Sequence, residues 1–230
     1  MKGTLKKWTI LAMLTAFVLI AGGCSIQQEL DVVGKGAIAS FNSILTTVEG
    51  QVMPDEINGG WSLPAPDGSI RFFWSKDYSR SPKHDLMMEL DAQPFLDAGL
   101  DTGKLPESIA FFEGKLLIGT KLGKDELKYS GEVSPLAAFE QIVSKYRESI
   151  AYHAPLDHFN VNLGNGNLFE WAKDMESNVK DIVFVLNAEP FIAAGVDPGA
   201  VTGWTFAKVT VHADGKPTET DKFLKSFDLK

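Results

Sequence analysis

The chain has 230 residues, with 30 acidic side chains against 22 basic ones, which gives a net charge of −8 at pH 7. An acidic surface repels phosphate backbones and anionic headgroups, so the composition argues against nucleic acid and anionic lipid as partners. The single cysteine has no second cysteine with which to form an internal disulfide, so the fold has to be stabilised by burial rather than by crosslinks.

The N-terminal segment has the order of an export signal. Three lysines within the first seven residues precede an uncharged apolar run from Trp8 to Ile20, and the small residues 21–23 follow it. The run is shorter than the roughly 20 apolar residues that a permanent membrane span requires. Residues 1–23 are therefore predicted to be a signal peptide.

The string LIAGGC, residues 19–24, resembles the lipobox of bacterial lipoproteins. The resemblance implies cleavage before Cys24, a diacylglycerol on its thiol and a fatty acyl group such as palmitate on the new N-terminus. Two or three acyl chains make a stable anchor in a lipid bilayer. Ser25, rather than Asp, follows the cysteine, which in this family implies the outer membrane of a two-membrane cell. In a cell with one membrane, the protein would lie on the outer face of that membrane.

The mature chain divides into a tether and two halves. Residues 24–35 show no strong periodicity and are predicted to be a flexible tether. Residues 36–131 and 132–230 are predicted to be two repeats that form one compact domain. Removing residues 1–23 takes away three lysines and no acid, so the net charge changes from −8 to −11.

An internal repeat relates the two halves. The sequence DLMMELDAQPFLDAGLDTG, from Asp85 to Gly103, returns with its register intact as DIVFVLNAEPFIAAGVDPG, from Asp181 to Gly199. Trp74 in WSKD returns as Trp171 in WAKD. A repeat of this length indicates a duplicated structural unit.

The same order of elements is predicted in each half. An amphipathic helix comes first, followed by two strands, a short helix and a further β-type stretch. This order predicts an α+β fold with α-β-β-β units repeated twice about a pseudo-twofold axis, and it leaves open whether the two sheets join or face each other. In chain order the predicted elements are a helix over 38–48, strands 70–74 and 86–90, a short helix at Pro94 and a strand pair from Ile109; then a helix over 136–150, strands at Leu168 and 182–186, a short helix at Pro190 and a strand over 204–212.

Asp101 and Asp197 are the candidate catalytic residues. LDTG at residues 100–103 resembles the signature of aspartic proteases, which pair one such motif from each of two halves. Two carboxylates that share a proton activate water. The second copy, however, reads VDPG, and Pro198 lacks the hydroxyl that the family places beside its aspartate. Capping of the turn after each short helix is the alternative role for both residues.

Trp61 and Trp204 are the candidate ligand-binding residues. Trp61 follows two glycines in a loop-like stretch, where an exposed aromatic side chain is well placed to bind a ligand. Trp74 and Trp171 occupy equivalent strand positions in the repeat, which predicts that both belong to the core.

No cofactor or metal site is predicted. His153 and His158 flank Pro155 in AYHAPLDH, a spacing that matches no established metal site and indicates a surface loop. NLGNGN, residues 162–167, is predicted to be a turn between strands. No hydrolase elbow, phosphate loop or dinucleotide motif occurs in the sequence.

Together these features predict a membrane-anchored extracytoplasmic lipoprotein that is a binding protein or a structural protein of the cell envelope rather than an enzyme. The expected partner is a small molecule, a peptide or another envelope protein. A carboxylate-dependent envelope hydrolase and a subunit of an envelope complex are the alternatives.

Overall fold

The computed structural model describes residues 14–15, 23–76, 84–121, 133–145, 147–175, 178–213 and 216–229. The fold is α+β, and the described helices and strands follow the same order in both halves. The first half contains α1 (Gly23–Thr47), β2 (Met53–Asp55), β3 (Gly60–Pro64), β4 (Ile70–Ser75), β5 (Leu86–Asp91), α2 (Gln93–Asp97), β6 (Ile109–Phe112) and β7 (Lys115–Thr120). The second contains α3 (Pro135–Lys145), β8 (Ile150–His153), β9 (His158–Asn162), β10 (Leu168–Ala172), β11 (Ile182–Asn187), α4 (Glu189–Ala193), β12 (Thr205–Ala213) and β13 (Lys216–Phe227).

Each half forms one antiparallel sheet, and the two sheets have the same topology. The strand order is β2-β3-β4-β5-β7-β6 in the first sheet and β8-β9-β10-β11-β13-β12 in the second. A short strand β1 (Leu14–Thr15), from the segment predicted to be a signal peptide, adds in parallel to β12. Residues 1–13 and 16–22 of that segment lie outside the described residues.

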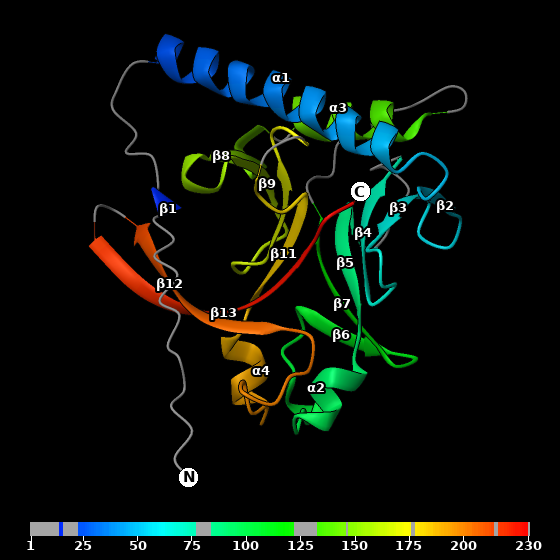
Figure 1. Cartoon of the computed structure of the whole chain (residues 1–230), viewed down its shortest axis with the longest axis vertical. Helices are drawn as coiled ribbons and strands as arrows, with labels where there is room; N and C mark the ends of the chain where they lie inside the picture. The colour runs from blue at the N-terminus through cyan, green and yellow to red at the C-terminus, as the bar shows by residue number, and fades with distance from the viewer. Residues whose placement is uncertain are drawn as a thin grey trace.

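The two sheets face each other across a pseudo-twofold axis. In Figure 1, α1 and α3 lie at one end of the pair of sheets, and α2 and α4 lie at the other. Equivalent aromatic rings meet along the axis: Phe41 and Phe139 stack at 3.8 Å, Phe72 and Phe169 at 4.1 Å, and Phe95 and Phe191 lie 4.9 Å apart. Trp74 and Trp171 are fully buried beside them, which confirms the predicted core position.

The two long helices are exchanged between the halves. The Ser40 hydroxyl on α1 donates a hydrogen bond to the carbonyl of Ala172 on β10, at 2.6 Å. A Cβ atom on Gly36 would lie 2.8 Å from the Phe159 ring on β9, so α1 approaches the second sheet closely. In the opposite sense, the indole of Trp74 on β4 donates to the carbonyl of Pro135 at the start of α3, at 2.9 Å. Each helix therefore packs on the sheet of the other half.

The segment predicted to be a tether is helical. Residues 24–35 form the first turns of α1, which has 25 residues. Gln27, Gln28, Glu29 and Leu30 favour helix even though the segment has no clear apolar stripe. Among the described residues, no helix combines the length and apolar character that a membrane span requires.

The strand count and one helix end also differ from the prediction. Each half has six strands rather than three or four, because the sequence pattern does not predict β2, β3, β8, β9 and β13. The second helix ends at Lys145, not at Ile150, because Ile150 starts β8 and pairs with Val161. The NLGNGN turn is confirmed between β9 and β10, where Gly164, Asn165 and Gly166 all have positive φ.

Candidate ligand-binding site

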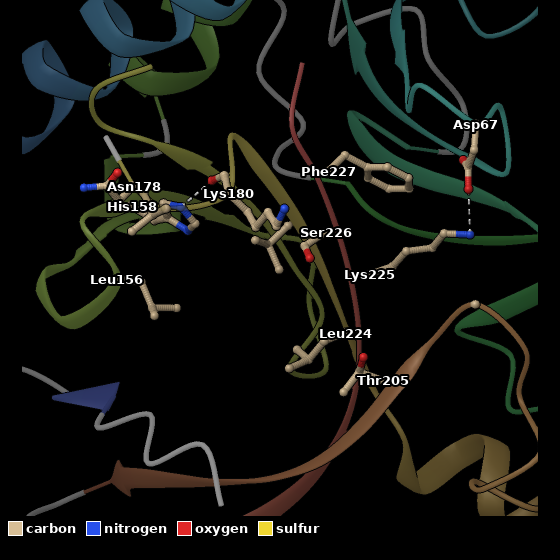
Figure 2. Close-up of a pocket in the computed structure, with 13 residues that line it drawn as sticks. Asp67, Leu156, His158, Asn178, Lys180, Thr205, Leu224, Lys225, Ser226 and Phe227 are labelled. Carbon is tan, nitrogen blue, oxygen red and sulfur yellow. Dashed lines mark hydrogen bonds and ion pairs between the residues drawn. The ribbon is translucent and has the colours of Figure 1, made fainter. Parts of the chain in front are cut away.

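A cavity of about 660 Å³ opens where β13 extends beyond β12. The pairing between these strands ends at Thr205 opposite Leu224, so residues 225–227 continue past the start of β12. Figure 2 shows His158 and Lys180 at one end of this cavity and Asp67 with Lys225 at the other. We call it the β13 cavity.

Strand alternation gives the β13 cavity an apolar wall. Phe184 on β11 and Phe223 on β13 point into the core, so their neighbours Val183 and Leu224 lie on the opposite face of the sheet. Val183 and Leu224 line the cavity together with Leu156, from the connection between β8 and β9. Thr205 and Ser226 add two hydroxyl groups to this wall.

Lys225 is the cation at one end of the β13 cavity, and strand alternation places its side chain on the core face of β13, opposite to Leu224. Its side chain is only 11% exposed, and its ammonium lies 3.0 Å from Asp67, which comes from the β3–β4 turn of the other half. The same ammonium lies 5.8 Å from the Trp204 ring centre and 5.7 Å from that of Phe227. Cation–π attraction and the ion pair therefore hold the ammonium in one place.

Asp67 is held independently of Lys225. Its carboxylate accepts hydrogen bonds from the backbone amide of Ser69, at 2.9 Å, and from the Ser69 hydroxyl, at 2.6 Å. Partial burial raises the pKa of Asp67, but the two Ser69 bonds and Lys225 outweigh this and hold the pKa below its ordinary value. The ionised carboxylate is thus a stable part of the turn.

A buried charged cluster lies behind the other end of the cavity. The carboxylate of Glu170 on β10 faces Nδ1 of His158 at 3.5 Å and Nδ1 of His153 at 3.8 Å. All three side chains are at most 5% exposed. The second ring nitrogen of His158, Nε2, lies 2.7 Å from the carbonyl oxygen of Lys180.

These contacts show which ring nitrogen of His158 donates to the backbone. Nε2 has to carry a proton in order to donate to the Lys180 carbonyl. A neutral ring would then turn the lone pair of Nδ1 toward the Glu170 carboxylate. Burial raises the pKa of Glu170, but the two histidines more than offset this effect and lower the pKa, so the carboxylate is ionised.

The internal repeat shows that core packing does not require this cluster. Strand register makes Gly60 the equivalent of His158, Phe73 that of Glu170 and Asp55 that of His153. In the first half, the Phe73 ring covers Gly60, where a Cβ atom would lie 2.6 Å from it. At these three positions the second half buries two histidines and a carboxylate, whereas the first half buries only the carboxylate of Asp55, which pairs with Arg71 at 3.4 Å. The cluster is therefore a feature specific to the second half.

Asp101 and Asp197 each accept a hydrogen bond from the turn that follows their own short helix. Asp101 accepts a hydrogen bond from the Gly103 amide at 3.1 Å, and Asp197 accepts one from the Gly199 amide at 2.9 Å. The hydrogen bond from Lys104, followed by that from Gly103, holds the pKa of Asp101 below its ordinary value. Both residues cap the turns that follow α2 and α4.

The two candidate tryptophans lie in different surroundings. Trp61 is on β3, opposite Trp74, and is half-buried against the core rather than exposed in a loop. Trp204 packs edge-on against Phe95 at 5.6 Å, and its neighbours Gly203 and Thr205 line the β13 cavity. Of the two, only Trp204 lies beside the cavity.

The prediction that His153 and His158 lie in a surface loop is wrong. Only residues 154–157 form the connection, and the two histidines face each other as the paired ends of β8 and β9. Pro155 fits this connection because the residues 154–156 make a single 3₁₀ turn. Within the described part of the chain, no group of three or more His, Cys, Asp and Glu side chains is arranged to hold a metal ion.

Comparison of the chain with protein-family models, curated proteins and solved structures found no match. Function is therefore inferred from the residues of the β13 cavity and of the buried cluster.

Proposed function

We propose that this chain is a lipid-anchored extracytoplasmic binding protein that holds a small ligand in the β13 cavity. The observation that carries the proposal is a cavity that combines an apolar wall with His158 of the buried His158–Glu170 pair, and that reaches the enclosed ammonium of Lys225 on the other face of β13. Ligand sites are typically concave and apolar, with a few fixed polar groups that orient the ligand.

Binding suits these residues better than catalysis does. A general base needs a free lone pair within reach of a substrate proton. Nε2 of His158 is committed to the Lys180 carbonyl, and its Nδ1 faces Glu170. The capping role of Asp101 and Asp197 likewise gives no support to the hydrolase alternative.

The anchor follows from the lipobox resemblance and fits the start of α1. Cys24 is the second residue of this helix, so the acyl chains would leave the protein at one helix end. Replacing Cys24 by Ser should abolish incorporation of labelled palmitate and move the protein from the membrane fraction to the soluble fraction. Ser25→Ala is the matched control and should keep the label. Membrane retention of the Cys24→Ser chain with its label intact would contradict the anchor.

The binding site is tested with a neutral apolar dye, Nile red, on the full chain carrying Cys24→Ser. We expect one dye molecule per chain and a binding constant that falls at least about tenfold when Leu224→Trp fills the cavity. Ile192→Trp, at an exposed position on α4 that does not line the cavity, is the control. Equal binding by the Leu224→Trp and Ile192→Trp proteins would refute the site.

A further inference from the structure

The hairpin of β12 and β13 is longer than its counterpart in the first half. In the first half, Phe112 pairs with Lys115 across a two-residue turn of Glu113 and Gly114, both of which have positive φ. Strand register makes Lys222 the equivalent of Lys115. A hairpin built like that of the first half would therefore turn directly before Lys222.

The second-half hairpin continues past this point as a two-stranded extension. Its strands form six further pairs, from Lys208 opposite Asp221 to Ala213 opposite Lys216. We call residues 208–221 the arm. In Figure 1 the arm extends to the left of the view, and β1 lies beside the end of β12. The duplicated unit does not require the arm, since the first half folds with a two-residue turn in its place.

The arm has only two strands when residues 1–23 are absent. β11 pairs with β13 only as far as Lys222, so it adds no strand beside residues 216–220. On the other side of the arm, β12 pairs among the described residues only with Leu14 and Thr15 of β1. Both belong to the segment whose removal the lipobox resemblance implies. A ribbon of two strands is marginally stable in water, and a third strand stabilises it.

The β12 edge is the side of the arm that is open to a further strand. β12 contains no proline, whereas Pro217 gives β13 a backbone nitrogen without a hydrogen. Leu14 and Thr15 show that a strand fits in parallel beside Val211 and His212. An edge of this kind presents unpaired N–H and C=O groups to which another strand can bond.

We propose that the arm is a docking site for an extended segment of a partner protein, which adds to β12 in parallel beside Val211 and His212. The segment is uncharged, since the strand that fits this edge comes from the run Trp8 to Ile20, which has no charged residue. Main-chain hydrogen bonds supply the affinity in strand addition of this kind. The lining residues of the β13 cavity all lie outside the arm, so this inference is independent of the proposed ligand site.

The test uses residues 24–230 with Cys24→Ser, which keep strands β2 to β13 and leave the β12 edge without β1. The probe is a fluorescein-labelled peptide with the sequence of residues 11–18, LAMLTAFV, joined to a polyethylene glycol tail for solubility. Fluorescence anisotropy measures its binding. A matched peptide carries N-methyl groups on the residues that correspond to Leu14 and Thr15, so it keeps the side chains and loses two hydrogen-bond donors. We expect the N-methylated peptide to bind at least about tenfold more weakly.

A variant without the arm tests where the peptide binds. Replacing residues 208–221 by Glu-Gly gives the second half the turn that the first half uses. This variant should keep a cooperative melting transition and its binding of Nile red, and it should lose the anisotropy change with the peptide. Lys208→Met is the control, because it removes the side chain that pairs with Asp221 but leaves the backbone of the arm intact. It should leave the binding constant of the peptide unchanged.

The outcomes separate this inference from the proposed function. Equal binding of the two peptides, or undiminished binding by the variant without the arm, would overturn the docking site. Dimerisation of residues 24–230 in analytical ultracentrifugation, without binding of the peptide, would assign the edge to a second copy of this chain and would also overturn it. If Nile red still binds in these cases, the ligand-binding function stands. Should the variant without the arm not fold, the comparison of the two peptides decides the result.

Discussion

Replacing Gly99 by Ala should destabilise the junction between the two halves. Gly99 and Gly195 follow α2 and α4 and lie back to back on the pseudo-twofold axis. Their φ angles are +99° and +101°, and a Cβ atom on Gly99 would lie 3.0 Å from the carbonyl oxygen of Gly195. Reciprocal backbone hydrogen bonds flank this contact: Asp101 donates to Ala194 at 2.9 Å, and Asp197 donates to Ala98 at 2.8 Å.

Two separate costs add up in the Gly99→Ala chain. An L-residue in left-handed backbone costs about 1–2 kcal/mol relative to glycine. Crowding a packed contact costs a further 1–3 kcal/mol, roughly, because backbone rather than a flexible side chain has to move. We therefore expect the free energy of unfolding to fall by about 2–5 kcal/mol.

Urea unfolding followed by circular dichroism measures this loss, with the stability read from the midpoint and the slope. Gly114→Ala is the matched control, because Gly114 has φ of +77° but a Cβ atom at this position would meet no other atom within 4 Å. It should show the backbone cost alone. Equal losses in the Gly99→Ala and Gly114→Ala chains would refute the argument that the two halves touch at this glycine pair.

Three other predictions follow from the packing and the charges. Glu170→Gln should lower the free energy of unfolding near neutral pH. Because the pKa of Glu170 in the fold lies below its ordinary value of 4.5, the ionised carboxylate stabilises the fold above that pH, and this contribution is lost as the pH falls toward the lower folded pKa. The stability difference between parent and variant, measured in urea, should therefore shrink as the pH falls below 4.5; a difference that grows would contradict the pairing. Phe41→Ala should cost about 3–5 kcal/mol, because the ring stacks on Phe139 and meets Trp74 and Trp171 edge-on; a loss below about 1 kcal/mol would show that the rings do not pack along the axis in this way. Residues 132–230 expressed alone should remain unfolded by circular dichroism and gain structure when residues 24–131 are added, since each sheet needs the helix of the other half; independent folding of either fragment would count against the helix exchange.

The repeat makes the α+β architecture predictable from the sequence. Trp74 and Trp171 belong in the core because they recur at equivalent positions, and the local chemistry of Gly99 and Asp101 predicts a helix stop and a cap. Strands with mixed composition are not predictable in this way. The sequence of β13 is KPTETDKFLKSF, which is mostly polar. It is recognisable as a strand only in the structure, where β11 and β12 pair with it on both sides.

The β13 cavity could not be predicted from the sequence for a similar reason. Asp67, His158 and Lys225 come from three distant segments, and only the pairing of strands and the meeting of the two halves bring them to one cavity. The two histidines do carry a signal. A connection of four residues between two strand ends places the flanking residues opposite each other. The pairing of His153 with His158 could therefore have been predicted from the sequence.

The exchanged helices have a consequence for the ancestry of such a chain. A polypeptide with only one half could cover its sheet by associating with a second copy, each copy lending its helix to the other, and the result would be a homodimer with an isologous interface. Joining the copies in one chain fixes their stoichiometry and frees each to mutate separately. A homodimer would have to carry Phe73 at both sites or Glu170 at both. The fused chain has one of each, so it can devote one face to packing and the other to a charged cluster.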